Sequence, residues 1–492
     1  MPRHVVVISF DHLHLGYLGC YGNEWVETPT FDQLAARAVV FDGHFAANLT
    51  PGSDHPWWTG INPIQGQPLQ PANGNLIQWL QSAGIHTTLV VEDDRSGGAA
   101  VTPAFDEIVT VRVQDADELT DGETPFAQLV GEVCQRLAAG TYPSKSDSLL
   151  WIKSRGVPTP WIPPIEYVDL YYDELGVGGG QDDDDLDDDD VQDDKVQDDD
   201  EPEDGESDWS DATDEETTTD DSLNYEEYEY VRPGAELRAE ELPADGPSTD
   251  GIPSVGSVPV EELDEPDDDL LARVAMPDEP DLLPVPQWDE EMQELQMARA
   301  WYASYVTHLD RWLGKLLHAI DQRPEFKESL VIVTAAAGSH VGERGLETQS
   351  PPPLEETIHV PLLLRLPTRE RDGNRVLALT QTTDLLPTVG EWLGLKPEAV
   401  LPTAGRSLLP IVREEPRTDR QAVLIGDEQY VGLRTAEFYY LRPRDAARVS
   451  DEESEPLLFH KPADRWDRQN VIHRQPGRAD ELDAQLTQAI TP

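Results

Sequence analysis

Basic residues are scarce in this 492-residue chain, where 36 Lys and Arg stand against 97 Asp and Glu for a formal charge of −61. Nucleic-acid binding needs clustered cations that face the phosphates, so this charge balance excludes nucleic acid as a partner. An anionic membrane surface would repel the chain for the same reason. We therefore expect neither kind of partner.

Cysteine and long apolar runs are scarce as well. Cys20 and Cys134 are the only cysteines, too few for a disulfide framework. No run approaches the roughly 18 to 20 apolar residues of a membrane span. The apolar run near the first residue is too short for a signal-peptide core and continues into charged and His residues, so it predicts a buried strand. These features predict a cytoplasmic protein.

Apolar runs alternate with helical patterns in residues 1–175. The run HVVVISF precedes a helix-like segment, NLIQWLQSAG leads into IHTTLVV, and SLLWIKS follows. Alternation of this kind is typical of an α/β fold with a mostly parallel sheet between helices. The opening run is apolar throughout, as a strand buried on both faces should be.

An acidic low-complexity segment interrupts this pattern over residues 176–288. Residues 181–230 alone contain 27 acidic residues and one base, Lys195, and so contribute −26 to the net charge. Charge repulsion and the lack of apolar groups leave such a segment unable to offset its ordering entropy. We expect it to be a disordered insert.

Ordered patterns return over residues 289–415, a second part of the α/β core. A long amphipathic helix there places Trp301, Tyr305, Trp312 and Leu316 at helical spacing, and the apolar strand SLVIVTAAAG follows. Residues 416–492 read as four short strands and a final helix, which predicts a small antiparallel sheet with one packed helix.

Several segments resemble sulfatases, members of the alkaline phosphatase-like superfamily, in their order and spacing. They are VVVISFDHLHLGYLGCYGN, LTPGSDHPWWTG, SLVIVTAAAGSHVGERGL, LEETIHVPLLLRLP and LLFHKPADRWDRQN. The resemblance covers nearly all of the chain outside the acidic insert. It implies the alkaline phosphatase-like fold and hydrolysis of sulfate or phosphate esters by a nucleophile that a divalent cation holds.

The resemblance places the site on particular residues. Asp11 ends the first strand and matches the family's first metal-binding Asp, and His12 follows it where many sulfatases have a second Asp. Thr50 falls where sulfatases carry the Cys or Ser that becomes formylglycine. Threonine is not a substrate for that modification, although a direct alkoxide mechanism stays open for it.

Other positions of the implied site carry residues of the wrong chemistry. The family's Arg after the nucleophile falls on Asp54, its Lys and His fall on Glu92 and Asp94, and the His of its mid-chain Asp-Pro-His falls on Pro158. An acid in place of a cation opposes the binding of an anionic ester.

The run VIVTAAAGSHVGERGL departs furthest from the family pattern. Its two metal ligands fall on Ala336 and Ala337, and a later Lys falls near Ser350. A methyl group does not coordinate a cation, and His340 and Glu343 would need a rebuilt loop to take over. We therefore expect no cofactor, or Ca²⁺ or Mg²⁺ if the site still functions.

Three functional readings follow. The first is a sulfatase by descent that has lost hydrolysis and acts as a binding or scaffold module. The second is an active hydrolase with a rearranged site on Thr50, Asp11 and His12. In the third, the acidic insert is the functional part and binds a basic protein or diffuse divalent cations.

Overall fold

The computed structural model describes most of the chain outside the acidic segment. The described residues are 2–49, 55–65, 74–93, 103–112, 120–143, 145–157, 161–172, 290–344, 352–395, 404–415, 419–445 and 454–491. They all belong to one compact unit, which residues 1–181 and 286–492 form. The predicted disordered insert lies outside the described residues.

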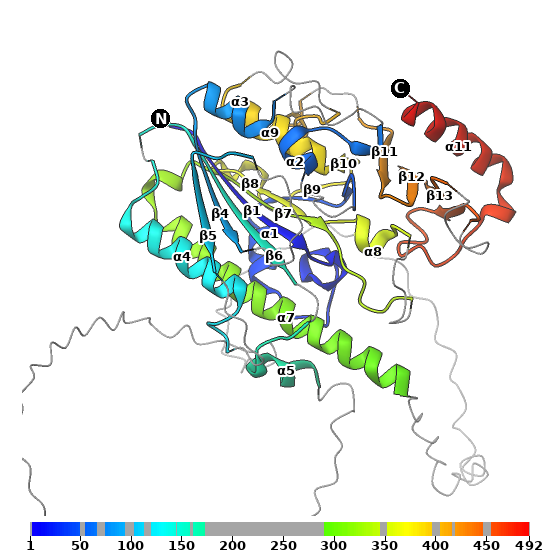
Figure 1. Ribbon diagram of the computed structural model, residues 1–492, viewed down its shortest axis with the longest axis horizontal. Helices are drawn as coiled ribbons and strands as arrows, with labels where there is room; N and C mark the ends of the chain where they lie inside the picture. The colour runs from blue at the N-terminus through cyan, green and yellow to red at the C-terminus, as the bar shows by residue number, and fades with distance from the viewer. Residues whose placement is uncertain are drawn as a thin grey trace, which may run out of the picture. The chain divides into compact units, whose positions relative to one another are not determined.

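A twisted sheet of eight described strands forms the centre of this unit (Figure 1). In spatial order the strands are β5 (Glu107–Val111), β4 (His86–Glu92), β6 (Ser148–Gly156), β1 (His4–His12), β7 (Leu330–Ala337), β8 (Leu362–Arg365), β2 (Val39–Phe41) and β9 (Arg375–Val376). The pairs from β5 to β7 are all parallel, whereas β8 runs antiparallel to both β7 and β2. The predicted mostly parallel sheet is confirmed.

Strand β1 lies between β6 and β7, and residues 4–10 are all buried. Its side chains alternate between two apolar layers, with Val6 and Ile8 in one layer and Val5 and Val7 in the other. Burial on both faces explains why the strand reads as one continuous apolar run.

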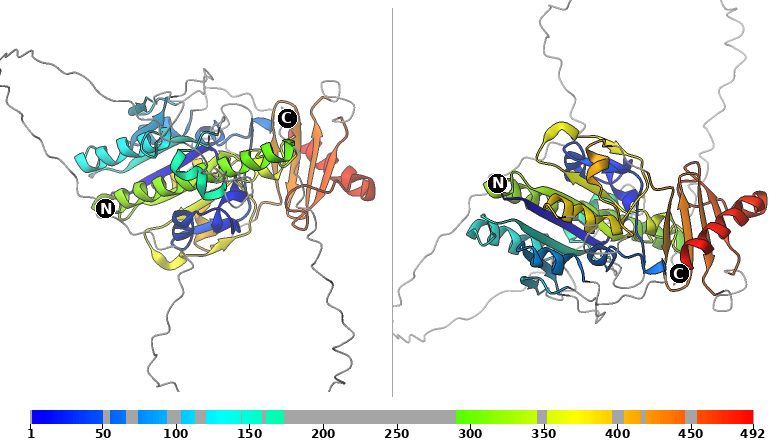
Figure 2. Two further views of the ribbon diagram at one scale, coloured as in Figure 1. Left: turned by 90° about the horizontal axis from the view of Figure 1, so that it is seen from below. Right: turned by 90° about the horizontal axis from the view of Figure 1, so that it is seen from above.

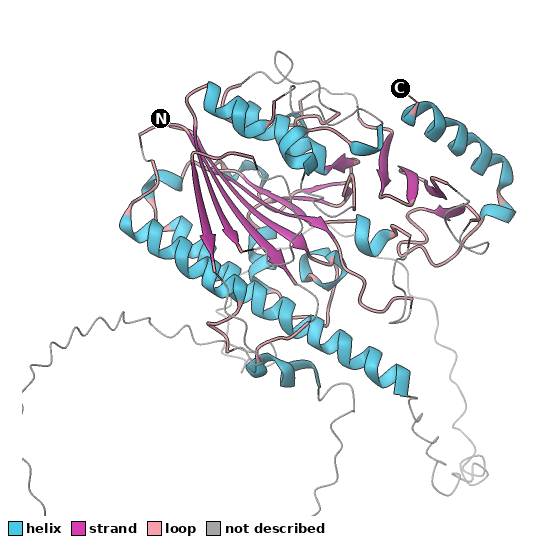
Figure 3. Ribbon diagram, in the orientation of Figure 1, coloured by secondary structure: helices cyan, strands magenta, loops and turns pink. Residues whose placement is uncertain are grey.

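Helices cover both faces of the sheet (Figure 3). One face packs against α1 (Pro29–Ala35), α4 (Pro125–Ala139) and α7 (Glu290–Asp321). The other packs against α2 (His55–Thr59), α3 (Leu76–Ser82), α9 (Leu385–Trp392) and the short α10 (Leu409–Val412). Two further short helices are α5 (Ile165–Tyr172), which packs on α7, and α8 (Glu355–Ile358).

Helix α7 is the long helix that the sequence predicts, and it also fixes a neighbouring helix. The carboxylate of Asp310 accepts hydrogen bonds from the backbone N–H groups of Thr30 (2.9 Å) and Phe31 (2.8 Å). These groups belong to the first turn of α1, where no intrahelical acceptor exists. None of the described helices combines the length and apolar composition that a bilayer crossing requires.

The C-terminal part forms a second, antiparallel sheet with one helix, as predicted. Its strands are β11 (Ala422–Gly426), β12 (Tyr430–Thr435), β13 (Phe438–Pro443) and β14 (Leu457–His460). Figure 2 shows this sheet standing beside one end of the central sheet, with α11 (Pro476–Ile490) on its far side. Its near face packs on Phe45, Leu354 and Ile358 of the core.

Candidate functional site at the carboxyl edge of the parallel sheet

The parallel strands β4, β6, β1 and β7 all end at one edge of the sheet. The register places Phe10 between Ser154 and Ala335, and it places His12 between Gly156 and Ala337. Asp11 therefore lies at the level of the last residues of both neighbouring strands. Open α/β sheets bind their ligands at this edge.

Asp11 forms an ion pair with a lysine from the neighbouring strand β6. The Lys153 ammonium Nζ lies 3.1 Å from Oδ1 and 3.2 Å from Oδ2 of Asp11. The two side chains are 15% and 29% exposed, respectively, so water screens the pair only in part. A positive charge within the protein thus already occupies the position beside this carboxylate.

Two alanines occupy the end of β7, on the other side of β1. Ala336 is 1% exposed and Ala337 is 5% exposed. Ala336 belongs to the apolar cluster that also holds Trp57 and Trp151. The end of β7 beside Asp11 is therefore buried and apolar, and its side chains offer no atom that binds a metal ion.

Glu92 at the end of β4 is held by a second cation of β6. Its Oε2 accepts a hydrogen bond from the backbone N–H of Arg155 at 3.2 Å, and the Arg155 guanidinium Nε lies 3.5 Å away. The Glu92 side chain is 2% exposed. Burial raises the pKa of this carboxyl, and hydrogen bonds from Ser154 and Arg155 oppose the rise.

The remaining polar groups near this edge are engaged elsewhere. His12 is exposed, and its Nδ1 lies 3.3 Å from the carbonyl oxygen of Gly338. The ring of His340 contacts Glu356 at 3.4 Å, and Glu343 pairs with His14 at 3.1 Å.

The Glu343 carboxylate is held by His14 and by the backbone N–H of Val341. Burial alone would raise the pKa of its carboxyl, but the hydrogen bond and charge of His14 and the N–H of Val341 lower it to about 2. His340 and Glu343 thus each have a partner of their own, Glu356 and His14.

Five of the residues singled out from the sequence cannot be placed. Thr50, Asp54, Asp94, Pro158 and Ser350 lie outside the described residues. The roles assigned to them stay predictions. Asp11, Glu92, Ala336 and Ala337 do come together at one edge, as strand order requires.

Lys153 and Arg155 were missed by the sequence reasoning. The signal is present in the run LLWIKSRG, where two basic residues alternate at the end of an otherwise buried strand. Lys153 reaches Asp11 of β1 and Arg155 reaches Glu92 of β4, so the two side chains diverge from β6 to its two neighbouring strands. The resemblance drew attention to the family's own positions and away from this strand.

These residues do not fit the divalent cation that the resemblance implies. Ca²⁺ and Mg²⁺ need several oxygen ligands, and here one carboxylate lies beside an ammonium and two methyl groups. Within the described ranges, no group of three His, Cys, Asp or Glu side chains is placed to hold a metal ion.

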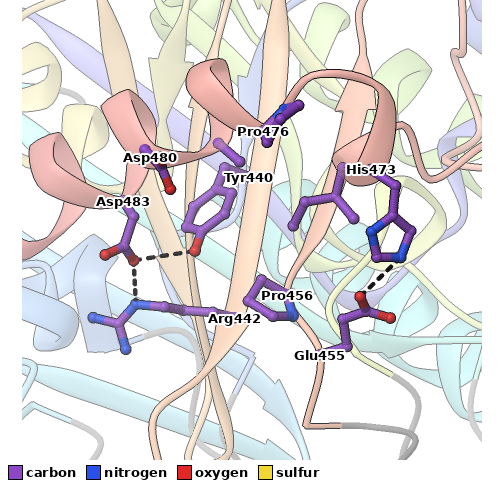
Figure 4. A pocket seen from close by; sticks show the side chains of 10 residues that line it. Tyr440, Arg442, Glu455, Pro456, His473, Pro476, Asp480 and Asp483 are labelled. Atoms are coloured by element: carbon purple, nitrogen blue, oxygen red, sulfur yellow. Dashed lines mark hydrogen bonds and ion pairs between the residues drawn. The ribbon is translucent and has the colours of Figure 1, made fainter.

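A separate pocket of about 570 Å³ opens between β13, β14 and the start of α11 (Figure 4). Its polar groups pair with one another: Asp483 accepts a hydrogen bond from the Tyr440 hydroxyl (3.1 Å) and contacts Arg442 (2.8 Å), and His473 contacts Glu455 (3.0 Å). No buried polar group is left pointing into this space among those drawn.

The comparisons with known proteins agree with the topology. The structure resembles that of a phosphonate monoester hydrolase of Agrobacterium radiobacter, with a TM-score of 0.62 and 17% identity over 99% of this chain and 95% of that one. At this identity the likeness establishes the fold, which is alkaline phosphatase-like. The model of the Sulfatase family matches residues 3–125 and 201–395, and the chain belongs to that family.

Two curated relatives illustrate the distance within the family. The chain is 24% identical over 161 residues to the multifunctional alkaline phosphatase superfamily protein PehA of Trinickia caryophylli. The aligned segment covers 32% of this chain and 30% of PehA. It is 25% identical over 211 residues to the choline-sulfatase of Rhizobium meliloti. This aligned segment covers 42% of this chain and 39% of that enzyme. The chain thus matches about a third of the length of these relatives.

Proposed function

We propose that this member of the sulfatase family does not hydrolyse esters and acts as a binding or scaffold protein. The observation that carries the proposal is the placement of Ala336 and Ala337 beside β1 at the level of Asp11 and His12. The family's chemistry needs a cation that lowers the pKa of the nucleophile and neutralises the ester oxygens. Of the described carboxylates at this edge, Asp11 pairs with Lys153 and Glu92 is buried against Arg155, so neither is placed with further ligands around a cation.

The Lys153 ammonium, 3.1 Å from Asp11, weighs against a metal ion at the same carboxylate. A divalent cation and an ammonium about 4 Å apart repel each other by on the order of 8 kcal/mol at an effective dielectric constant of about 20. The ammonium therefore lowers the affinity of the Asp11 carboxylate for a metal ion.

The binding role is assigned to the acidic segment. Residues 181–230 carry a net charge of −26, and a segment of this charge attracts a basic protein over several ångströms of solvent. We take residues 176–288 as an insert in a core formed by residues 1–175 and 289–415, with residues 416–492 as its C-terminal subdomain.

An activity assay tests the loss of hydrolysis. Purified protein is incubated with p-nitrophenyl sulfate, p-nitrophenyl phosphate and a phenylphosphonate ester, each with EDTA, Ca²⁺, Mg²⁺ or Mn²⁺. We expect the rates to equal those of the Thr50→Ala variant under every condition. Turnover that Thr50→Ala abolishes would instead establish the alternative, an active hydrolase with Thr50 as its nucleophile and Asp11 and His12 at its metal.

A pull-down tests the binding role. The full chain and a variant that lacks residues 181–285 are used as baits for the same mixture of cellular proteins at low and high salt. We expect basic proteins to bind only the full chain and to be released by salt, because screening weakens charge attraction. Recovery of the same proteins by both baits contradicts the assignment.

A further inference from the structure

Strand β6 presents two basic side chains to two acidic side chains of its neighbours. Lys153 meets Asp11 of β1, and Arg155 meets Glu92 of β4. This arrangement is possible because β6 lies between β4 and β1 in the sheet. Near the end of β6, one basic residue contacts an acid on β1 and the other contacts an acid on β4.

The two pairs differ in how the acid is satisfied. Both carboxylate oxygens of Asp11 contact the Lys153 ammonium, at 3.1 and 3.2 Å. Glu92 receives a backbone N–H as well as the guanidinium of the same residue, Arg155. In both pairs the acid and its cation lie on adjacent strands, so the sheet itself fixes their separation.

We propose that Lys153 takes the place of the divalent cation as the counter-charge of Asp11, so that the edge is closed by an ion pair and the fold does not depend on metal. One ammonium balances one carboxylate, whereas a divalent cation needs several oxygen ligands arranged around it. In this proposal the methyl groups of Ala336 and Ala337 supply no ligand atom, and the ammonium of Lys153 supplies the positive charge beside Asp11. This inference rests on the proposed function and extends it to the residue that replaces the metal.

The charge of Lys153 is the feature to test. Lys153→Met keeps the length of the side chain and removes its charge, and Lys153→Arg keeps the charge. We expect Lys153→Met to lower the melting temperature by about 2–5 °C, because the partly buried Asp11 carboxylate loses its contact with the ammonium. Lys153→Arg should stay within about 1 °C of the wild type, as should Lys327→Met, a matched change at an exposed lysine.

Metal dependence is measured on the same proteins. The melting temperature of the wild type should be the same in EDTA and in 1 mM Ca²⁺, Mg²⁺ or Mn²⁺, and the purified protein should carry no stoichiometric metal by mass spectrometry. A ligand that binds only the folded state raises the melting temperature in proportion to the logarithm of its concentration over Kd, so weak occupancy is also visible.

Restored ligands provide the converse test. Ala336→Asp with Ala337→Asn returns two ligand groups beside Asp11. We expect a metal-dependent rise in melting temperature of several degrees when Lys153→Met is added to this pair, and a smaller rise when Lys153 is kept, because the ammonium then competes with the metal.

The outcomes separate the inference from the proposed function. Equal melting temperatures for Lys153→Met and Lys153→Arg overturn the inference while the absence of turnover stands. A wild-type protein that a divalent cation stabilises overturns it as well, even if Lys153→Met does not fold. Ester turnover by the wild type that is lost in Thr50→Ala overturns the proposed loss of hydrolysis, which the melting temperatures do not decide.

Discussion

Asp384 shows how this acidic chain handles charge in its interior. Its carboxylate contacts the guanidinium of Arg420 at 2.6 and 2.7 Å and accepts N–H bonds from Gln381 (2.8 Å) and Arg406 (2.7 Å). The side chains of Asp384 and Arg420 are 1% and 10% exposed. Every buried charge needs such a partner, because an unpaired one costs several kcal/mol.

Removal of this carboxylate should therefore be costly. We expect Asp384→Ala to lower the free energy of unfolding by about 3–5 kcal/mol, since it leaves the Arg420 guanidinium buried without its anion. Urea denaturation measures the change. Glu391→Ala removes the partner of Arg413 in a pair that is 31% and 45% exposed, and should cost less than about 1 kcal/mol. Similar losses in the two variants contradict this account.

His308 gives the stability a dependence on pH. It is fully buried, and desolvation lowers its pKa from 6.5 to about 4. The unfolded chain therefore binds a proton at a higher pH than the folded chain does. The stabilisation that the neutral, buried His308 gives to the folded state is complete above pH 6.5. It is lost as the pH falls from 6.5 towards 4.

A variant that does not titrate isolates this effect. The free energy of unfolding of the wild type should fall more steeply between pH 7 and pH 4.5 than that of His308→Gln, by about 2–3 kcal/mol over the range. Denaturant titrations at several pH values measure both slopes. Parallel pH profiles for the two proteins would show that His308 does not titrate in this window.

At the scale of elements, two glycines let the backbone close around the end of β1. Gly156 has a φ of 74°, and a Cβ on it would lie 2.1 Å from the carbonyl oxygen of His12. A Cβ on Gly338 would lie 1.9 Å from the carbonyl oxygen of Glu356. Both approaches are close enough to require glycine. The backbone segments around the candidate site therefore pack closely against one another at these two glycines.

Gly156→Ala should disturb this end of the strand. We expect a loss of at least about 2 kcal/mol in the free energy of unfolding, from both the positive φ and the contact with His12. The matched change is Gly477→Ala in the first turn of α11, where nothing lies within 4 Å of the added methyl group. That variant should be neutral or slightly more stable, and chemical denaturation that ranks the two the other way contradicts the argument.

At the scale of the whole molecule, residues 1–181 and 286–492 form one compact unit, which contains the four apolar clusters of the described residues. Deletion of 181–285 behind a short Gly-Ser linker should therefore leave the melting temperature within about 3 °C of the wild type, because loop length alone changes stability slowly. Differential scanning calorimetry measures this. A large loss of stability would show that the acidic segment contributes to the core.

Much of the fold could be predicted from local patterns, but some elements could not. The buried run at His4–His12 and the long helix α7 were both expected, because core-facing residues repeat there at the period of the element. Strand β5 (Glu107–Val111) was not predicted. It is an edge strand whose residues are all partly or largely exposed, so its pattern carries little hydrophobic signal.

The sequence by itself determined the charge, the alternation of strands and helices, the resemblance to the family and the presence of alanine at positions 336 and 337, since each of these depends on residue type and order alone. Only the tertiary structure decided which side chain lies beside Asp11. Asp11 and Lys153 are 142 residues apart in the chain and meet because β6 pairs with β1 in parallel register. Strand pairing of this range depends on the whole sheet, so no local pattern reports it.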